Sequence, residues 1–369
     1  MNSIIPFFSQ KRENYFLKKK NNKIFNKIFL SGKFLQGQSV IDLEKKLCVL
    51  FKAKYCICVN SCTDALFFSL LSLNLKKKDE VLVTNFSWIA SASCIVRAGA
   101  KPVFVDINSD YNMNLIEAQK KITKKTKVLL YVHLFGKTGN LKCIRDFCDK
   151  NNLILIEDIA QTFSSSNCKT KAGTVGDLVC ISFDPTKTIS APGSGGAVVT
   201  NSAKLYNFVK KARYHGKNIK KSQFDFLGYN SQMPSLTAAI LNEKLKYNDK
   251  WIKRRQSIAR YYSNTLSKYV VTPKVDKNHV FHKYVILTKK RNALIKHLKK
   301  NNIESMIHYS TMLSENKYLK KFTKKKEKFK FTKQATKTAL SLPIHSFLKK
   351  NEEKKIVKTI IKFFSSQTL

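Results

Sequence analysis

The sequence predicts an α/β fold in which helices flank a mainly parallel sheet. Along the first 250 residues, short and nearly continuous apolar runs alternate with helical patterns. This alternation is typical of strands that are buried on both faces between helices. The chain has 369 residues, of which 43% are hydrophobic, so it can form a large core and two domains.

Seven apolar runs are the candidate strands. They are short, rich in Val, Ile, Leu and Phe, and separated by polar segments. In chain order they cover residues 55–59, 81–84, 102–107, 128–133, 153–158, 179–183 and 197–200. We therefore predict a seven-stranded sheet.

Amphipathic segments at residues 64–75 and 141–151 predict two of the helices between these strands. Residues 242–268 predict a long helical stretch, and a smaller mixed segment follows it. Residues 351–364 predict an amphipathic helix with Ile356, Ile360 and Phe364 on one side. We expect a large α/β domain over residues 1–250, including an N-terminal arm, and a small C-terminal α+β domain over residues 251–369.

Composition and charge restrict the function classes. The formal net charge is +45, but lysines are spread from end to end. We therefore favour a lysine-rich surface over a specific nucleic-acid site, which needs a concentrated basic patch. No apolar stretch approaches the roughly 18 residues of a membrane span, and the start lacks a secretory signal pattern. The nine cysteines fit neither a zinc pattern nor a disulfide framework. We expect a cytoplasmic protein with reduced thiols and no metal.

A separated aspartate and lysine carry the strongest functional signal. Asp158 ends the apolar run 153–158, and Lys187 stands just before the glycine-rich segment 193–196. A lysine can bind pyridoxal 5'-phosphate (PLP) as a Schiff base, and an aspartate can keep the pyridine nitrogen protonated, so that the ring withdraws electrons. The pair predicts a PLP site. The glycines let the backbone approach a neighbour closely before the next strand.

The helix start after residues 55–59 is the candidate phosphate site. Free N–H groups and the positive end of a helix dipole favour an anion there, and Ser61 and Thr63 add hydroxyl groups. Ordinary helix capping is the alternative, and these residues taken alone favour it. Ser182 offers a further hydroxyl before Lys187.

Two residues near other strand ends are candidates for contact with the ring. Trp88 follows the run 81–84, where a flat aromatic can stack on a pyridine; a core tryptophan is the alternative. Gln161 follows Asp158 at a strand end, where open α/β sheets bind ligands. Its alternative is a surface polar residue, and that of Asp158 is a helix N-cap.

These residues occur within a longer series of motifs. The chain resembles the DegT/DnrJ/EryC1/StrS family of PLP-dependent sugar aminotransferases, which have the aspartate aminotransferase fold (fold type I), and the resemblance covers nearly the whole sequence. The matching segments, in order, are 30–37 with Glu44, 61–66, 99–106, 133–136, 157–161, 182–187, 195–197, 213–216, 228–230, 238–239, 254–255, 308–309 and 342–343.

The resemblance implies a role for each matched residue. Lys187 binds the cofactor and acts in catalysis, and Asp158 is the partner of the pyridine nitrogen. Trp88 stacks on the ring, and Gln161 lies near its phenolic oxygen. The phosphate is held by Cys62, Thr63, Ser182 and, across the interface of a homodimer, Asn230.

Three positions depart from the family pattern. Cys62 replaces a usual glycine, Ser194 replaces a usual acidic residue, and Gln232 replaces a usual arginine. None of them removes a group that Schiff-base chemistry requires. They bear on substrate preference and efficiency.

The resemblance implies a ping-pong transamination from glutamate to a nucleotide-linked keto-deoxysugar, for O-antigen, another surface polysaccharide or a related glycan. A nucleotide-sugar 3-dehydratase that depends on PLP or pyridoxamine phosphate (PMP) is one alternative, but such enzymes resemble this chain with His at position 187. A non-catalytic homologue is another, and the retained Asp158, Gln161, Ser182 and Lys187 oppose it.

Overall fold

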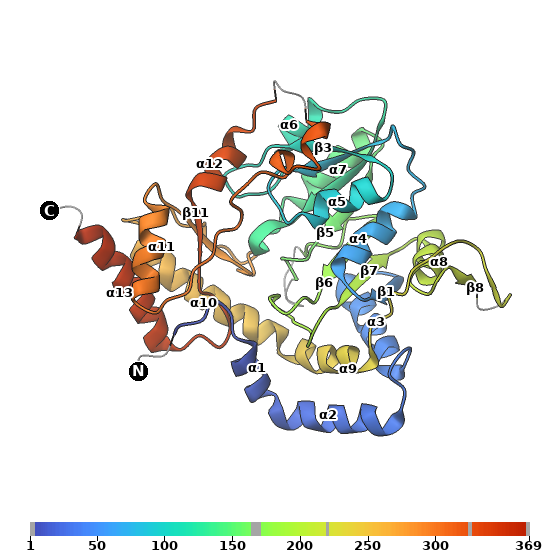
Figure 1. Cartoon of the computed structure of the whole chain (residues 1–369), viewed down its shortest axis with the longest axis horizontal. Helices are drawn as coiled ribbons and strands as arrows, with labels where there is room; N and C mark the ends of the chain where they lie inside the picture. The colour runs from blue at the N-terminus through green and yellow to red at the C-terminus, as the bar shows by residue number, and fades with distance from the viewer. Residues whose placement is uncertain (1–3, 164–170, 219–220, 324–326, 367–369) are drawn as a thin grey trace.

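The computed structural model describes residues 4–163, 171–218, 221–323 and 327–366 (Figure 1). A seven-stranded sheet has the order β1-β7-β6-β5-β4-β2-β3. Its strands are β1 (Tyr55–Val59), β2 (Glu80–Thr84), β3 (Lys101–Val105), β4 (Thr126–Val132), β5 (Ile154–Asp158), β6 (Leu178–Ser182) and β7 (Gly196–Thr200). Only β7 runs against its neighbours in this sheet. The predicted mainly parallel, seven-stranded sheet is confirmed.

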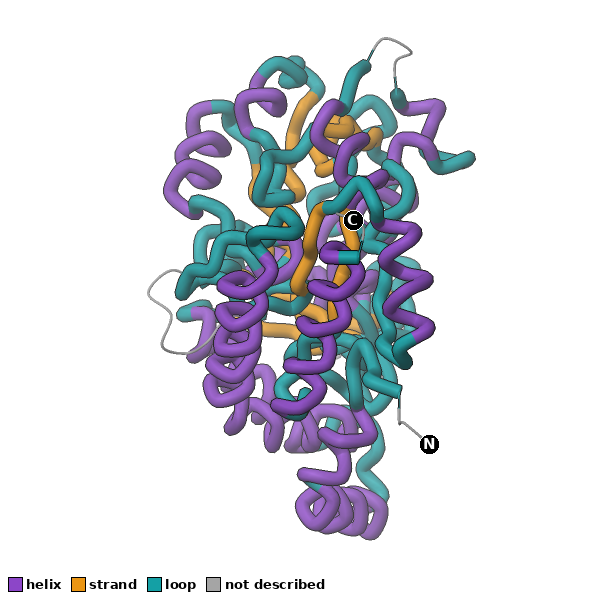
Figure 2. Tube along the Cα trace, turned by 90° about the vertical axis from the view of Figure 1, so that its left-hand side faces the viewer, coloured by secondary structure: helices purple, strands orange, loops and turns teal. Residues whose placement is uncertain are grey.

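Helices bury both faces of this sheet, as the apolar strands require. Successive strand residues point to opposite faces: Ile57 of β1 belongs to one apolar cluster, and Cys58 belongs to another. The first cluster includes α4 (Cys62–Leu71), α5 (Ala90–Arg97) and α8 (Ala203–Ala212); the second includes α3 (Gln38–Phe51) and α9 (Ser235–Lys244). A third cluster packs α6 (Leu115–Gln119) and α7 (Leu141–Lys150) on the sheet. Figure 2 shows helices outside the strands.

The C-terminal part has its own apolar cluster. It contains the antiparallel pair β10 (Tyr284–Leu287) and β11 (Ala339–Leu342), with α10 (Asn248–Leu266), α11 (Arg291–Lys300) and α13 (Lys350–Ser365). These elements lie to the left of the larger sheet in Figure 1. Because α10 places Trp251 in a sheet cluster and Ile258 in this one, it passes between the two parts. The domain boundary near residue 250 stays a prediction.

The long helical stretch predicted over residues 242–268 is confirmed up to Leu266, and a 3₁₀ turn divides it. The structure has α9, a 3₁₀ turn at Leu245–Tyr247, and then α10. Lys244 at the end of α9 is 1% exposed; its ammonium pairs with Glu13 at 2.5 Å and donates to the Ser190 carbonyl at 2.6 Å. These contacts join segments far apart in sequence, so the local pattern of apolar residues does not predict them.

The N-terminal segment begins with α1 (Gln10–Phe16) and α2 (Lys18–Ser31). No side chain of α2 is buried. Its apolar residues Phe25, Phe29 and Leu30 are 51%, 60% and 84% exposed. Figure 1 shows α2 along the outer edge of the chain. The remaining strands are the short β8 (Lys217–Asn218) and β9 (Gln223–Phe224), and the remaining α-helix is α12 (Lys330–Thr338).

Candidate active site

A cavity of about 480 Å³ lies at the carboxyl ends of the parallel strands. Open α/β sheets bind ligands at such ends because loops from several strands converge there. The cavity brings together seven of the eight predicted site residues, which are Cys62, Thr63, Trp88, Asp158, Gln161, Ser182 and Lys187. The eighth, Asn230, does not line it.

Asp158 is the last residue of β5 and is 4% exposed. Its carboxylate accepts a hydrogen bond from the Ala160 N–H at 2.9 Å. Burial raises the pKa of Asp158, while that N–H and the nearby Lys187 act in the opposite direction. A buried carboxylate of this kind favours a cation beside it. A turn follows Asp158 over the residues described up to 163, so the helix N-cap alternative is wrong.

Lys187 lies in a loop whose ends are tied together. The Phe183 N–H donates to the Gly195 carbonyl at 2.8 Å, and the Ala191 N–H donates to the Phe183 carbonyl at 2.7 Å. Within the loop, the Lys187 N–H donates to the Asp184 carbonyl at 2.9 Å. Lys187 is therefore held on the wall of the cavity that Asp158 also lines, close enough to lower the pKa of Asp158.

The start of α4 forms another wall. Ser61 caps this helix, because its hydroxyl accepts a hydrogen bond from the Asp64 N–H at 3.1 Å; the N–H groups of Cys62 and Thr63 have no partner within a helix at these positions. A Cβ at Gly196 would lie 2.4 Å from the Ser61 carbonyl carbon and 2.6 Å from the Cys62 nitrogen. Glycine at 196 thus lets β7 approach the start of α4 closely. We call this helix start, Ser61 to Thr63, the cradle. Burial raises the pKa of Cys62, so its thiol adds no charge opposing an anion.

Trp88 and Gln161 have opposite exposures. Trp88 is 64% exposed at the cavity, so the core alternative is wrong. Gln161 is 7% exposed, which excludes a surface role. Its side-chain oxygen accepts from the Phe135 N–H at 3.0 Å, and its nitrogen donates to the Tyr309 hydroxyl at 3.0 Å. Tyr309 and Trp88 contact each other, with ring centroids 6.5 Å apart.

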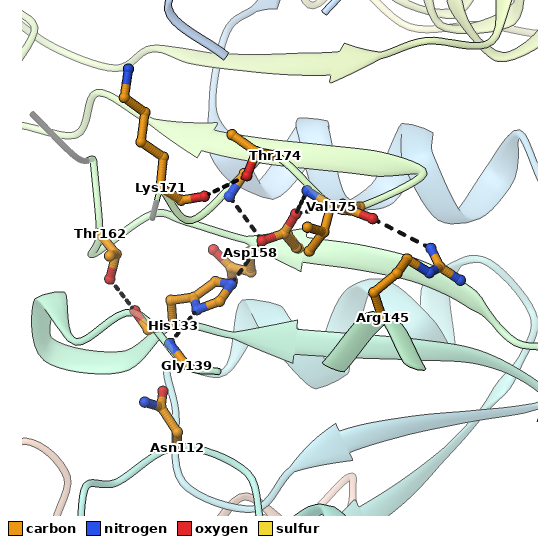
Figure 3. Close-up of polar contacts among 12 residues, drawn as sticks. Asn112, His133, Gly139, Arg145, Asp158, Thr162, Lys171, Thr174 and Val175 are labelled. Atoms are coloured by element: carbon orange, nitrogen blue, oxygen red, sulfur yellow. Dashed lines mark hydrogen bonds and ion pairs between the residues drawn. The ribbon is translucent and has the colours of Figure 1, made fainter. Parts of the chain in front are cut away.

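A buried polar network supports the strand end that carries Asp158 (Figure 3). The Gly139 N–H donates to His133 Nδ1 at 3.1 Å, so the proton of a neutral His133 is on Nε2, 3.0 Å from Glu157 Oε1. Glu157 is fully buried and also accepts from the N–H groups of Gly173 and Val175. Burial by itself raises the pKa of Glu157. The hydrogen bonds from His133 and these N–H groups outweigh that effect, so the pKa lies below its ordinary value.

Asn230 is exposed and lies elsewhere. It pairs with Tyr214 in an isolated bridge, and its side-chain oxygen accepts from Gln232 at 3.4 Å. Ser194, another departure from the family pattern, does line the cavity. A single chain thus forms the cavity without Asn230.

His282 and Lys283 line the cavity and were not among the predicted site residues. They precede β10, in the sequence Val280-Phe281-His282-Lys283-Tyr284-Val285. The available signal was a pair of polar residues within an apolar run. Such a pair has no evident role until the C-terminal part packs against the sheet.

The described residues hold neither a metal-binding group nor a membrane-spanning helix. Within the described ranges, no three His, Cys, Asp or Glu side chains form a group that could hold a metal ion. No helix in those ranges is long and apolar enough to cross a bilayer.

Comparisons with known proteins agree with the resemblance seen in the sequence. The dTDP-3-amino-3,6-dideoxy-alpha-D-galactopyranose transaminase of Aneurinibacillus thermoaerophilus is 34% identical over 98% of this chain and 99% of its own. The pleiotropic regulatory protein of Geobacillus stearothermophilus is 32% identical over 98% of both. The structure of NtdA from Bacillus subtilis with bound cofactor PMP superposes with a TM-score of 0.92 at 25% identity, over 99% of this chain and 86% of that one. A profile of the DegT/DnrJ/EryC1/StrS aminotransferases matches residues 16–361, and the chain belongs to that family.

Proposed function

We propose that the protein transfers an amino group from an amino acid, with glutamate as the expected donor, to a keto group of a nucleotide-linked deoxysugar. The observation that carries this proposal is the placement of Lys187 and Asp158 on the walls of one cavity. The dTDP-sugar transaminase that matches 98% of the chain supports the substrate class. The product would enter a surface polysaccharide, such as an O-antigen, or a related glycan.

The cofactor of this chemistry is PLP, which supplies an electron sink for the carbon that gains or loses the amino group. The residues present fit it. The Lys187 amine reaches the cavity as the group that binds the cofactor and then moves a proton as base and acid. Asp158 favours a protonated ring nitrogen, because such a cation compensates its burial.

The remaining predicted residues serve binding. The α4 start at Cys62 and Thr63, beside Gly196, suits a phosphate because its N–H groups point outward at the positive end of the helix dipole. Ser182 adds a hydroxyl at the end of β6. Trp88 presents a flat, exposed face for stacking. Gln161, fixed by Phe135 and Tyr309, presents its amide to the ring.

We also propose a homodimer. The exposed apolar side chains of α2 suit a surface covered by a second copy. Asn230, which is exposed in the single chain, would act across that interface. Sedimentation analysis should give a dimer, and Phe29→Lys should shift it toward monomer; a wild-type monomer that is fully active contradicts this part.

Lys187→Ala tests the catalytic proposal. The variant should lose turnover and the visible absorbance of the lysine-bound cofactor. Lys204→Ala, an exposed lysine of α8, is the matched control and should keep both. Retention of both signals in Lys187→Ala contradicts the assignment.

The two alternatives predict different results in the same assay. A 3-dehydratase would release a deoxygenated sugar in place of an amino sugar, and Lys187 opposes this because those enzymes resemble the chain with His there. A non-catalytic homologue would bind the cofactor and convert none of the UDP-, dTDP- or GDP-linked keto sugars offered with glutamate. One of the relatives is named as a regulatory protein, so the assay with these keto sugars is needed to separate an enzyme from a non-catalytic homologue.

A further inference from the structure

Lys283 is a second lysine in the cavity that the proposed chemistry leaves without a role. It precedes β10, is 7% exposed, and lines the cavity together with Lys187. Its ammonium lies 4.9 Å from the centroid of the Phe7 ring. Two chain segments far apart in sequence thus place this cation on the cavity wall.

The charge of Lys283 is not balanced within the single chain. Among the residues that the structure describes, its ammonium contacts the Phe7 ring and has no hydrogen-bond or ion-pair partner. Burial, together with Lys187 and Arg255, lowers the pKa of Lys283 to about 7, against a smaller opposing effect of Asp184. An uncompensated buried charge is unfavourable, so this position favours an anion that arrives from outside.

The neighbouring His282 supplies an independent observation. It is 3% exposed and lines the same cavity. Neither ring nitrogen has a hydrogen-bond partner in the described part of the chain. Burial holds the pKa of His282 well below its ordinary value, so the ring is neutral and offers one N–H donor. Buried polar groups left without partners are uncommon in folded proteins and call for a ligand or water.

We propose that Lys283 and His282 form a carboxylate-binding subsite of this cavity. The inference rests on the proposed function, which brings an amino acid to the cavity in every cycle. The two aspartates that line the cavity with Lys283 are already engaged, because Asp158 accepts from the Ala160 N–H and Asp184 accepts from the Thr186 N–H. The cradle proposed for the cofactor phosphate is on another wall, at the start of α4.

A carboxylate at this subsite has two possible sources. One is the α-carboxylate of the amino donor, and the other is the carboxylate of a uronate sugar on the acceptor. In either case, a substrate anchored at Lys283 lies in the cavity that Lys187 shares. Fixing the substrate beside the proton-transferring amine reduces the entropy cost of the reaction.

The test compares wild type with Lys283→Met in the holoenzyme. Methionine keeps the unbranched shape and most of the length of the side chain and removes its charge, so folding should be retained. The donor half-reaction is followed with glutamate, as the loss of visible cofactor absorbance in single turnovers. The acceptor half-reaction is followed with one neutral and one uronate nucleotide-linked keto sugar. Lys204→Met is the surface control.

If the donor carboxylate binds there, the half-saturating glutamate concentration rises at least about tenfold, as expected for loss of a hydrogen bond to a charged group. If the uronate binds there, the half-saturating concentration of that sugar alone rises. Both outcomes support the subsite. Unchanged constants for glutamate and for the uronate sugar overturn it, and so does loss of the cofactor absorbance, which places Lys283 at the cofactor instead.

The pH dependence gives a readout that a structural role would not move. A lysine with a lowered pKa is charged below that pKa and neutral above it. Carboxylate binding by wild type should therefore weaken as pH rises through about 7, and this change should be absent in Lys283→Met. A wild type without bound-cofactor absorbance or amino transfer refutes the proposed function itself, so the two failures are distinguishable.

Discussion

Glu157→Gln should destabilise the protein strongly, although it removes only a charge and hardly changes the shape. The Glu157 carboxylate is 0% exposed. Oε1 accepts from Gly173 N–H at 2.8 Å and from His133 Nε2 at 3.0 Å. Oε2 accepts from Val175 N–H at 3.0 Å and from Gly176 N–H at 2.5 Å. All four contacts come from donors.

An amide in this position turns one acceptor oxygen into an NH₂ group that faces two donors. His133 cannot accept from it without losing the Gly139 contact at its other nitrogen. Two buried donors thus lose their partner, and each costs about 1–3 kcal/mol. We therefore expect the free energy of unfolding to fall by about 2–6 kcal/mol, the combined cost of these two unsatisfied donors.

Urea denaturation monitored by circular dichroism at pH 7 measures this loss. Glu117→Gln is the matched control, since Glu117 pairs with Lys120 on the surface, where both side chains are 40% or more exposed; it should change the unfolding free energy by less than about 1 kcal/mol. A Glu157→Gln variant within about 1 kcal/mol of wild type would refute the reasoning.

The same pair has a pH signature. The pKa of Glu157 in the folded protein lies below its ordinary value of 4.5. Its ionisation therefore contributes stability above that ordinary value, and the contribution is lost as pH falls through the lower folded value. The difference between wild type and Glu157→Gln should narrow below about pH 4.5; a difference that stays constant down to acid unfolding contradicts this account.

Two further predictions concern the cofactor site. Gly196→Ala should raise the dissociation constant of PLP at least about tenfold, as measured by titration of the apoenzyme, because the added Cβ would lie 2.4 Å from the Ser61 backbone. Gly195→Ala is the control: its Cβ would meet its nearest atom at 3.2 Å, and the dissociation constant should change little. Equal effects of the two variants would argue against the cradle. Trp88→Ala should leave the unfolding free energy within about 0.5 kcal/mol, since exposed side chains contribute little, yet weaken PLP binding. Trp251→Ala, at a site 5% exposed, should cost about 3–5 kcal/mol, and the reverse order would contradict the assigned exposures.

The sequence was most informative where the signal is local. The apolar runs predicted the seven strands, because a strand that is buried on both faces needs apolar side chains on both. The motif of Asp158 and Gln161 at one strand end, with Lys187 before a glycine-rich turn, indicated the site, because strand ends and turns require particular residues at short spacing. The 3₁₀ break after Lys244 was not predictable in this way, since it coincides with an ion pair to Glu13.

The sequence by itself determined the fold class, the family and the residues proposed to act on the cofactor. Only the tertiary structure decided that Gly196 contacts the Ser61 backbone, that Trp88 is exposed, and that His282 and Lys283 from the C-terminal part line the cavity beside Lys187. The physical reason is that desolvation and charge balance depend on contacts between distant segments. A lysine in a run of apolar residues becomes a buried cation, and a candidate for substrate binding, only when that packing removes it from water.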